Sequence, residues 1–177
     1  MDFTSLYLSL NSILPEISIA TFLMLIVGVD LIFDKEKKYI PYIALTGLLF
    51  TAYLLICQLG TSASAFALVS TNSSGMIAVD PFGIYFKLLI VLSSMIIVFF
   101  SMSSLEIRKV FDRQGEYYAL MFGMILGMMM MVSAVDLILI YLSIELLSLS
   151  SYVLAGFTKL RNRNSEASLK YIIYGSA

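Results

Sequence analysis

A single carboxylate lies in the middle of an apolar segment that is long enough to cross a membrane. The segment is 136–157, DLILIYLSIELLSLSSYVLAGF, and no Lys or Arg occurs within ten positions of its Glu145. Glu145 falls about 13 Å along a helix from Asp136, near the centre of a bilayer. An unpaired charge at that depth is strongly unfavourable, so we expect Glu145 to face the bundle interior, to be neutral or to have a partner.

The polar residues around Glu145 share one face of the expected helix. Tyr141, Glu145, Ser148 and Tyr152 have the spacing i, i+4, i+7 and i+11, which places them in one stripe. Ionisable residues inside membranes usually belong to ion or proton pathways. The alternative is a protonated Glu145 that only hydrogen-bonds one helix to another.

A second pair of charges occurs at the start of the last apolar segment. Glu166 precedes Lys170 by four residues, which is the favourable order for a pair on one helix face. Lys170 is therefore either a functional intramembrane charge, half of a surface pair, or a side chain that extends to the membrane surface. Glu166 follows Ser165, so it is also suited to the first turn of a helix.

The remaining charges within apolar segments have simpler alternatives. Lys87 lies one to two turns into its segment, so it either extends to the membrane surface or has a function. Ser133 and Asp136 have the spacing of a capping box at the start of 136–157. Asp30 is expected near the membrane surface, where it could contact the lysines that follow it.

The composition restricts the classes of function. The chain has 177 residues, of which 60% are hydrophobic and 13% are charged, whereas about a quarter of an average soluble protein is charged. There is no histidine, and the one cysteine is Cys57, which we expect to be buried. A disulfide within the chain, histidine ligation of haem, a cysteine-ligated iron–sulfur cluster and a His/Cys zinc site are therefore excluded.

The apolar segments predict an all-α, polytopic transmembrane helix bundle that forms one membrane domain over 1–177. About 20 apolar residues are needed for each span. Five segments are long enough, and a sixth is shorter. Gly123 and Gly127 form a GxxxG pattern, which allows two helices to approach closely. The expected helices are 14–33, 40–59, 82–104, 117–134, 136–157 and 165–177.

The basic residues predict the orientation of this bundle. Nine of the eleven Lys and Arg residues occur in three of the loops, and the alternate connections, 60–80 and 134–136, have none. Lys and Arg concentrate in cytoplasmic loops. We therefore expect the N-terminus to lie outside and the basic loops to lie inside. The nine residues are Lys35, Lys37, Lys38, Arg108, Lys109, Arg113, Lys159, Arg161 and Arg163.

Several stretches of the second half resemble one family of membrane proteins. These are DPFGIYFKLL, EYYAL, IELLSLSSYVLAGF and EASLKY, at the spacings found here. Their combination resembles the antiporter-like membrane subunits of proton-pumping NADH–quinone oxidoreductase, respiratory complex I, and YVLAGF fits subunit N better than subunits L and M. The resemblance covers residues 80–177, while 1–79 agree mainly in topology. It implies an N-terminal fragment of a subunit with about fourteen helices.

The resemblance also implies roles for individual residues. Glu145 matches the essential glutamate of the fifth helix, Lys170 matches a lysine of the sixth helix, and Glu166 matches the acidic residue four positions earlier. Tyr141, Ser148 and Tyr152 could order water beside Glu145. The implied function is proton translocation through buried Glu and Lys charges, coupled to quinone reduction in partner subunits.

The same resemblance implies where the redox chemistry occurs. NADH, FMN, iron–sulfur clusters and quinone are expected in partner subunits, with no cofactor in this chain. The partners would be other membrane subunits of complex I, especially antiporter-like and small ones, and the lipid of a bacterial inner membrane; no nucleic acid is expected. Two alternatives remain: a subunit of a multi-subunit sodium/proton antiporter, and a non-transporting membrane scaffold.

Overall fold

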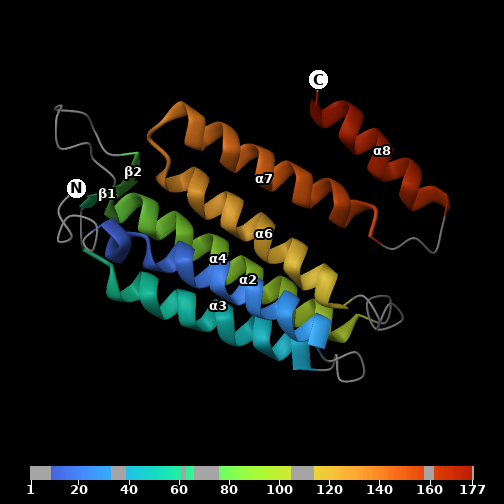
Figure 1. Ribbon diagram of the computed structural model, residues 1–177, viewed down its shortest axis with the longest axis horizontal. Coiled ribbons are helices and arrows are strands. Elements are labelled where there is room, and N and C mark those ends of the chain that lie inside the picture. Colours follow the sequence, from blue (N-terminus) through green and yellow to red (C-terminus); the bar gives the residue numbers. More distant parts are fainter. Residues whose placement is uncertain are drawn as a thin grey trace.

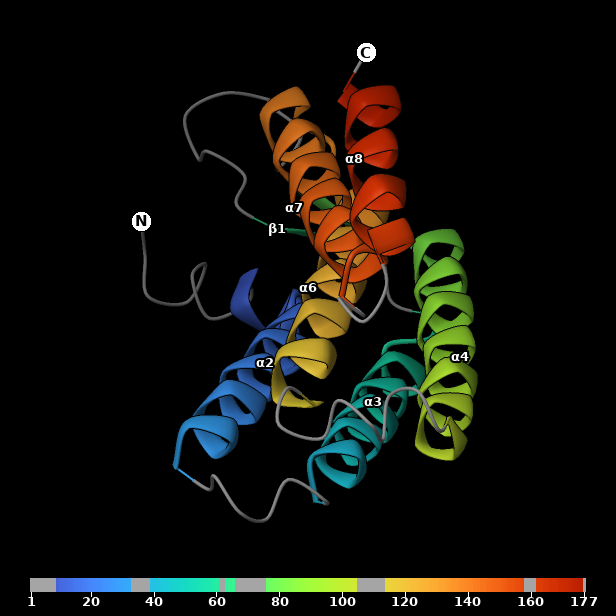
Figure 2. The same ribbon diagram turned by 90° about the vertical axis from the view of Figure 1, so that its right-hand side faces the viewer.

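A helical bundle makes up the protein, which confirms the predicted all-α fold (Figures 1 and 2). The computed structural model describes residues 9–32, 39–60, 63–65, 76–104, 114–157 and 162–176, except for the side chains of 63–65, 162–167 and 176. The first five of the labelled helices are long and apolar enough to span a membrane. The helices are α2 Leu14–Ile32, α3 Ile40–Cys57, α4 Pro81–Ser103, α6 Gln114–Ser133, α7 Leu137–Ala155 and α8 Asn162–Ser176.

Proline marks the start of three helices. All three prolines of the chain, Pro15, Pro41 and Pro81, occupy the first or second position of α2, α3 and α4. Proline is favourable there because its missing N–H would have no partner within the helix. The Asp80 side chain also caps α4 by accepting a hydrogen bond from the Gly83 N–H at 3.2 Å.

The connection between α6 and α7 differs from the predicted capping box. Ser133 is the last residue of α6, and its hydroxyl donates to the Met129 carbonyl oxygen at 3.4 Å. Asp136 itself caps α7 by accepting from the Ile138 N–H at 3.3 Å. The prediction was wrong because Ser133 is still part of α6 and therefore cannot be the N-cap of α7. That position is occupied by Asp136, three residues later.

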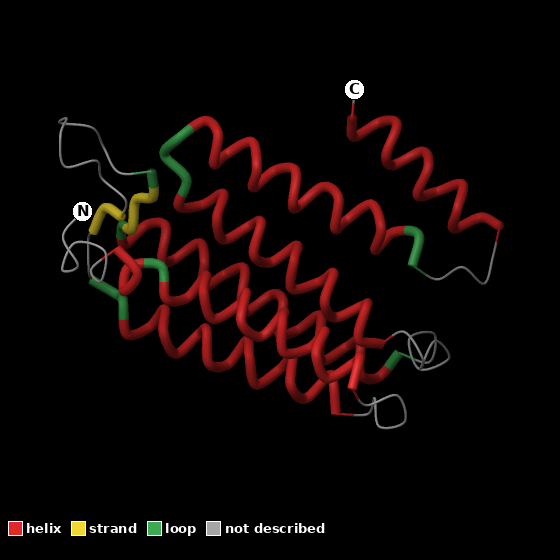
Figure 3. Tube along the Cα trace, viewed as in Figure 1, coloured by secondary structure: helices red, strands yellow, loops and turns green. Residues whose placement is uncertain are grey.

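A short β-hairpin lies at one end of the bundle, within the segment that the sequence indicated only as a loop (Figure 3). Strands β1 Ala63–Ala65 and β2 Ile77–Val79 pair antiparallel, with Ala63 opposite Val79. Ile77 also forms a bridge with Ala134, and the Val135 N–H donates to the Met76 carbonyl oxygen at 3.0 Å. The hairpin therefore fixes the turn between α6 and α7.

Helix α6 occupies the middle of the bundle. It packs against α2 and α4 on one side and against α7 on the other, while α3 packs on α2 and α4, and α8 packs on α7 (Figures 1 and 2). The apolar core lies among α2, α3, α4 and α6, and includes Ile19, Leu48, Val91 and Phe122. Cys57 is exposed at the end of α3, so the expectation that it is buried was wrong.

Two glycines allow α6 and α7 to approach closely. A Cβ atom on Gly127 would lie 2.9 Å from the Leu147 backbone nitrogen and 3.0 Å from the Ser143 carbonyl oxygen. A Cβ atom on Gly123 would lie 3.1 Å from Ser150 Oγ. Ser143 and Ser150 are the buried residues of α7, so α7 turns a small polar face to α6, while most of its large apolar residues are exposed.

Candidate functional site

A buried ion pair joins α2 to α4 inside the apolar bundle. Lys87 Nζ lies 2.5 Å from Glu16 Oε1. Only 1% of Lys87 and 4% of Glu16 is exposed. The Ser133 hydroxyl of α6 donates to the same Glu16 oxygen at 3.4 Å, so three helices contribute to the cluster. Lys87 is thus enclosed by the bundle, and the alternative in which it extends to the membrane surface is wrong.

The positions of these residues in their helices explain how the pair forms. Glu16 lies in the first turn of α2, where the helix dipole favours a carboxylate. Lys87 shares the buried face of α4 with Ile84, Val91 and Ser94. Consecutive spans alternate in direction, so the beginnings of α2 and α4 lie at the same end of the bundle (Figure 1). Removing one partner of such a pair typically costs about 3–5 kcal/mol, because the other charge remains buried and uncompensated.

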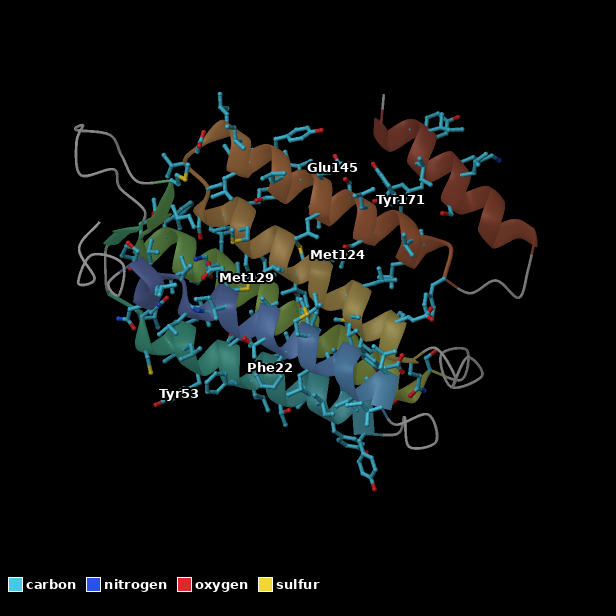
Figure 4. All side chains as sticks on the ribbon, in the orientation of Figure 1. Phe22, Tyr53, Met124, Met129, Glu145 and Tyr171 are labelled. Atoms are coloured by element: carbon cyan, nitrogen blue, oxygen red, sulfur yellow. The ribbon has the colours of Figure 1, made fainter. Side chains whose placement is uncertain are left out.

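Glu145 lies on the opposite side of α7 from the Ser143 and Ser150 face, in the middle of the helix (Figure 4). Both Glu145 and Tyr141 are exposed, and 65% of Tyr141 is accessible. Ser148 and Tyr152 are half-buried, and the Ser148 hydroxyl donates to the Glu145 carbonyl oxygen at 3.1 Å. The four residues form a stripe on the face of α7 that is turned away from α6.

The end of this stripe meets α8. The Tyr152 and Tyr171 rings stack edge to face with centroids 5.0 Å apart, and the Ser168 hydroxyl donates to the Tyr152 carbonyl oxygen at 3.0 Å. Lys170 is exposed on α8, and the described side chains do not include an ion pair between it and Glu145. Glu166 belongs to α8, but its side chain lies outside the described residues.

Two further polar contacts lie at the end of the bundle away from Lys87. The Ser101 hydroxyl of α4 lies 3.1 Å from the buried Tyr118 hydroxyl of α6. Asp30 of α2 packs against Gly115 so closely that a Cβ atom on Gly115 would collide with its carboxyl group. Asp30 therefore lies beside the start of α6, where the helix dipole favours a negative charge. No cluster of three His, Cys, Asp or Glu residues suited to a metal occurs in the described part of the chain.

Comparison with known proteins gives one consistent family. Residues 133–177 match the family described as NADH:quinone oxidoreductase/Mrp antiporter, TM. NADH-quinone oxidoreductase subunit N 2 of Chloroherpeton thalassium is 39% identical over 168 residues, which are 94% of this chain and 32% of that protein. Subunit N of Chlorobium chlorochromatii is 38% identical over 95% of this chain and 32% of its own length.

A solved structure has the same fold. A chain of respiratory complex I from Thermus thermophilus, with bound aureothin, superposes with a TM-score of 0.72 at 25% identity, over 92% of this chain and 33% of that one. Over nearly its whole length, this chain is similar to NADH-quinone oxidoreductase subunit N. It spans about a third of the length of the relatives it matches. As a subunit N homologue with five apolar helices, it is a multi-pass protein of the inner membrane.

Sequence reasoning missed Glu16 as a partner in the subunit N homologue. An acidic residue in the first turn of a helix is common, because it interacts favourably with the helix dipole. The positions of the two residues could have predicted the contact, because Glu16 and Lys87 both lie near the starts of apolar segments that begin at the same end of the bundle. By contrast, the segment matched by the family, 133–177, contains Glu145, Glu166 and Lys170.

Proposed function

We propose that this chain is part of a proton-translocating membrane subunit of NADH–quinone oxidoreductase. The observation that carries the proposal is Glu145, an ionisable side chain at the middle of an apolar span in a subunit N homologue. A carboxylate at that depth is unfavourable against lipid. The exposed apolar face around Glu145 must therefore pack against other protein segments. About two thirds of the length of each relative lies outside the part that matches this chain, and such a segment could supply this packing.

In this proposal Glu145 is the group that gains and loses the proton. The ionised form of a carboxylate is unfavourable against lipid or apolar protein and is stabilised by a nearby lysine, so movement of a lysine would drive protonation and release. Lys170 and Glu166 on the next helix would carry the charge onward. Tyr141, Ser148 and Tyr152 would order the water molecules between these groups, because hydroxyls both donate and accept hydrogen bonds.

The proposed division of labour leaves electron transfer to other subunits. NADH, FMN, iron–sulfur clusters and quinone would bind to partner subunits, and the energy of quinone reduction would reach this chain through its contacts with other membrane subunits. The chain itself has no histidine and one cysteine, which suits a subunit that moves protons without binding a redox centre.

The test is Glu145→Gln in the complete subunit, within the assembled complex. The variant keeps the size of the side chain but cannot release a proton, so we expect quinone reduction with loss of proton translocation. Glu116→Gln is the matched control, because the same chemical change is made at an exposed position in the first turn of α6. Wild-type proton translocation per quinone in Glu145→Gln would refute the proposal.

A subunit of a sodium/proton antiporter is the second candidate, because the description of the matching family includes the Mrp antiporter. The transported ion distinguishes the two candidates. Transport that requires sodium and continues without quinone reduction would favour the antiporter. Impaired assembly of Glu145→Gln, with normal transport by the complex that does form, would favour a scaffold.

A further inference from the structure

The Glu16–Lys87 cluster is separate from the Glu145 stripe. Glu16 is the third residue of α2 and Lys87 the seventh of α4, so their backbones lie about 3 and 9 Å from the helix starts. Both helices pack on the side of α6 that faces away from α7 (Figure 2). Glu145 is on the far side of α7 from α6, so two separate ionisable sites lie within the same apolar bundle.

One oxygen of the Glu16 carboxylate has an incomplete set of contacts. Oε1 contacts both the Lys87 ammonium and the Ser133 hydroxyl. Oε2 is equally enclosed but has no hydrogen-bond partner within the described residues. Buried polar atoms in folded proteins nearly always have a partner. A carboxylate oxygen in this position is therefore ready to bind a proton or the hydrogen of a water molecule.

Stability alone does not account for the pair. A buried ion pair is often no more stabilising than apolar side chains of similar volume, because both charges lose their hydration. The neighbours on the same face of α4, Ile84 and Val91, are apolar and fully buried. A third apolar residue at position 87 would continue that core, so the two charges are better explained by a task that requires ionisable groups.

We propose that Glu16 and Lys87 form a second proton-transfer site, near the end of the bundle that carries the β-hairpin. This inference rests on the proposed function of the chain. A proton delivered by water bonds to Glu16 Oε2, which neutralises the carboxylate. Lys87 then releases one ammonium proton to a second water molecule and becomes a neutral amine. Transfer of a proton from the Glu16 carboxyl group to the amine restores the ion pair, so one proton enters and one leaves, and no electron moves.

The contact with Ser133 links this site to α7. Ser133 ends α6, only Ala134 and Val135 separate it from Asp136, and Asp136 caps α7. The same turn is bonded to β2 through Ile77 and Met76. The charge of Glu16 therefore acts on the hydroxyl of Ser133. Ser133 lies next to the short turn that leads into α7, the helix that carries Glu145.

The decisive variant is Lys87→Arg in the complete subunit within the assembled complex. Arginine keeps the positive charge beside Glu16, but its guanidinium does not release a proton in proteins. A second variant, Glu16→Gln with Lys87→Met, removes both charges and leaves neither one uncompensated. Ser94→Ala is the matched control, because Ser94 is buried on the same face of α4 and its hydroxyl donates within its own helix, to the Ile90 carbonyl oxygen.

The readouts are the amount of assembled complex, the rate of quinone reduction and the number of protons translocated per quinone. We expect both variants to assemble, to reduce quinone and to lose proton translocation, while Ser94→Ala behaves as wild type. Wild-type translocation in either variant would overturn the inference. Failure of both variants to assemble would identify the pair as a structural contact, and would overturn it too.

Glu145→Gln, measured in parallel, separates this inference from the proposed function. If Glu145→Gln loses proton translocation while Lys87→Arg retains it, the inference fails and the proposed function stands. If Glu145→Gln retains wild-type translocation, the proposed role of Glu145 fails. Loss in Lys87→Arg would then identify Glu16 and Lys87, in place of Glu145, as the groups through which the chain passes protons.

Discussion

Substitution of Gly127 by alanine tests the close packing of α6 on α7. The new Cβ atom would lie 2.9 Å from the Leu147 backbone nitrogen and 3.0 Å from the Ser143 carbonyl oxygen. Both are main-chain atoms that cannot rotate away, so the two helices must separate. Overpacking of this kind typically costs about 1–3 kcal/mol.

Gly28→Ala provides the matched comparison. Gly28 lies within α2, and no atom lies within 4 Å of the position that its Cβ atom would occupy. Replacing glycine by alanine inside a helix is favourable by up to about 1 kcal/mol when space allows. This propensity difference is common to both variants. We therefore expect Gly127→Ala to be less stable than Gly28→Ala by about 1–3 kcal/mol, the cost of the clash alone.

The measurement is equilibrium unfolding of the complete subunit in mixed detergent micelles, with increasing amounts of a denaturing detergent. Gly123→Ala adds an intermediate case, because its Cβ atom would meet Ser150 Oγ at 3.1 Å, and that side chain can rotate. We expect the order of stability Gly28→Ala, then Gly123→Ala, then Gly127→Ala. Equal free energies of unfolding for the first and last variants would refute the close packing of α6 on α7.

Two further predictions use the same unfolding measurement. Lys87→Met leaves the Glu16 carboxylate buried without its counter-ion, so we expect a loss of about 3–5 kcal/mol; adding Glu16→Gln should restore most of it, and additive effects would contradict the pairing. Asp136→Ala removes the cap of α7 and should cost about 1 kcal/mol. The structure predicts that the losses of unfolding free energy in Asp136→Ala and Ser133→Ala are additive, because Ser133 does not cap α7. A double variant that loses less than the sum of the two would contradict this.

The spans could be predicted from sequence because length and apolarity determine them. The predicted ends lie within three residues of the described helix ends, as for the segment expected at 117–134 and observed as Gln114–Ser133. Prolines and acidic caps set several of these ends locally, without help from distant residues. The orientation with the N-terminus outside stays a prediction, since no membrane is present in the structure.

Features that depend on tertiary contacts could not be predicted in this way. Ser133 and Asp136 fit a capping-box pattern, yet the serine belongs to the preceding helix and contacts Glu16. The partner of Lys87 is 71 positions away in the sequence, and no local pattern joins them. Ala63 and Ser64 have weak preferences for strands, so the hairpin depends on its pairing with β2 and on the bridge from Ile77 to Ala134.

The short turn between α6 and α7 has a consequence for how the protein enters the membrane during synthesis. Only three residues, Ala134, Val135 and Asp136, separate the two spans. Helices α6 and α7 are therefore expected to leave the translocon together, as one helical hairpin. A helix with a central glutamate and several serines inserts poorly by itself. With α6 already beside it, Ser143 and Ser150 face the glycines of α6 instead of lipid. Bulkier residues at Gly123 and Gly127 should therefore reduce membrane insertion of α7 before they affect any later step.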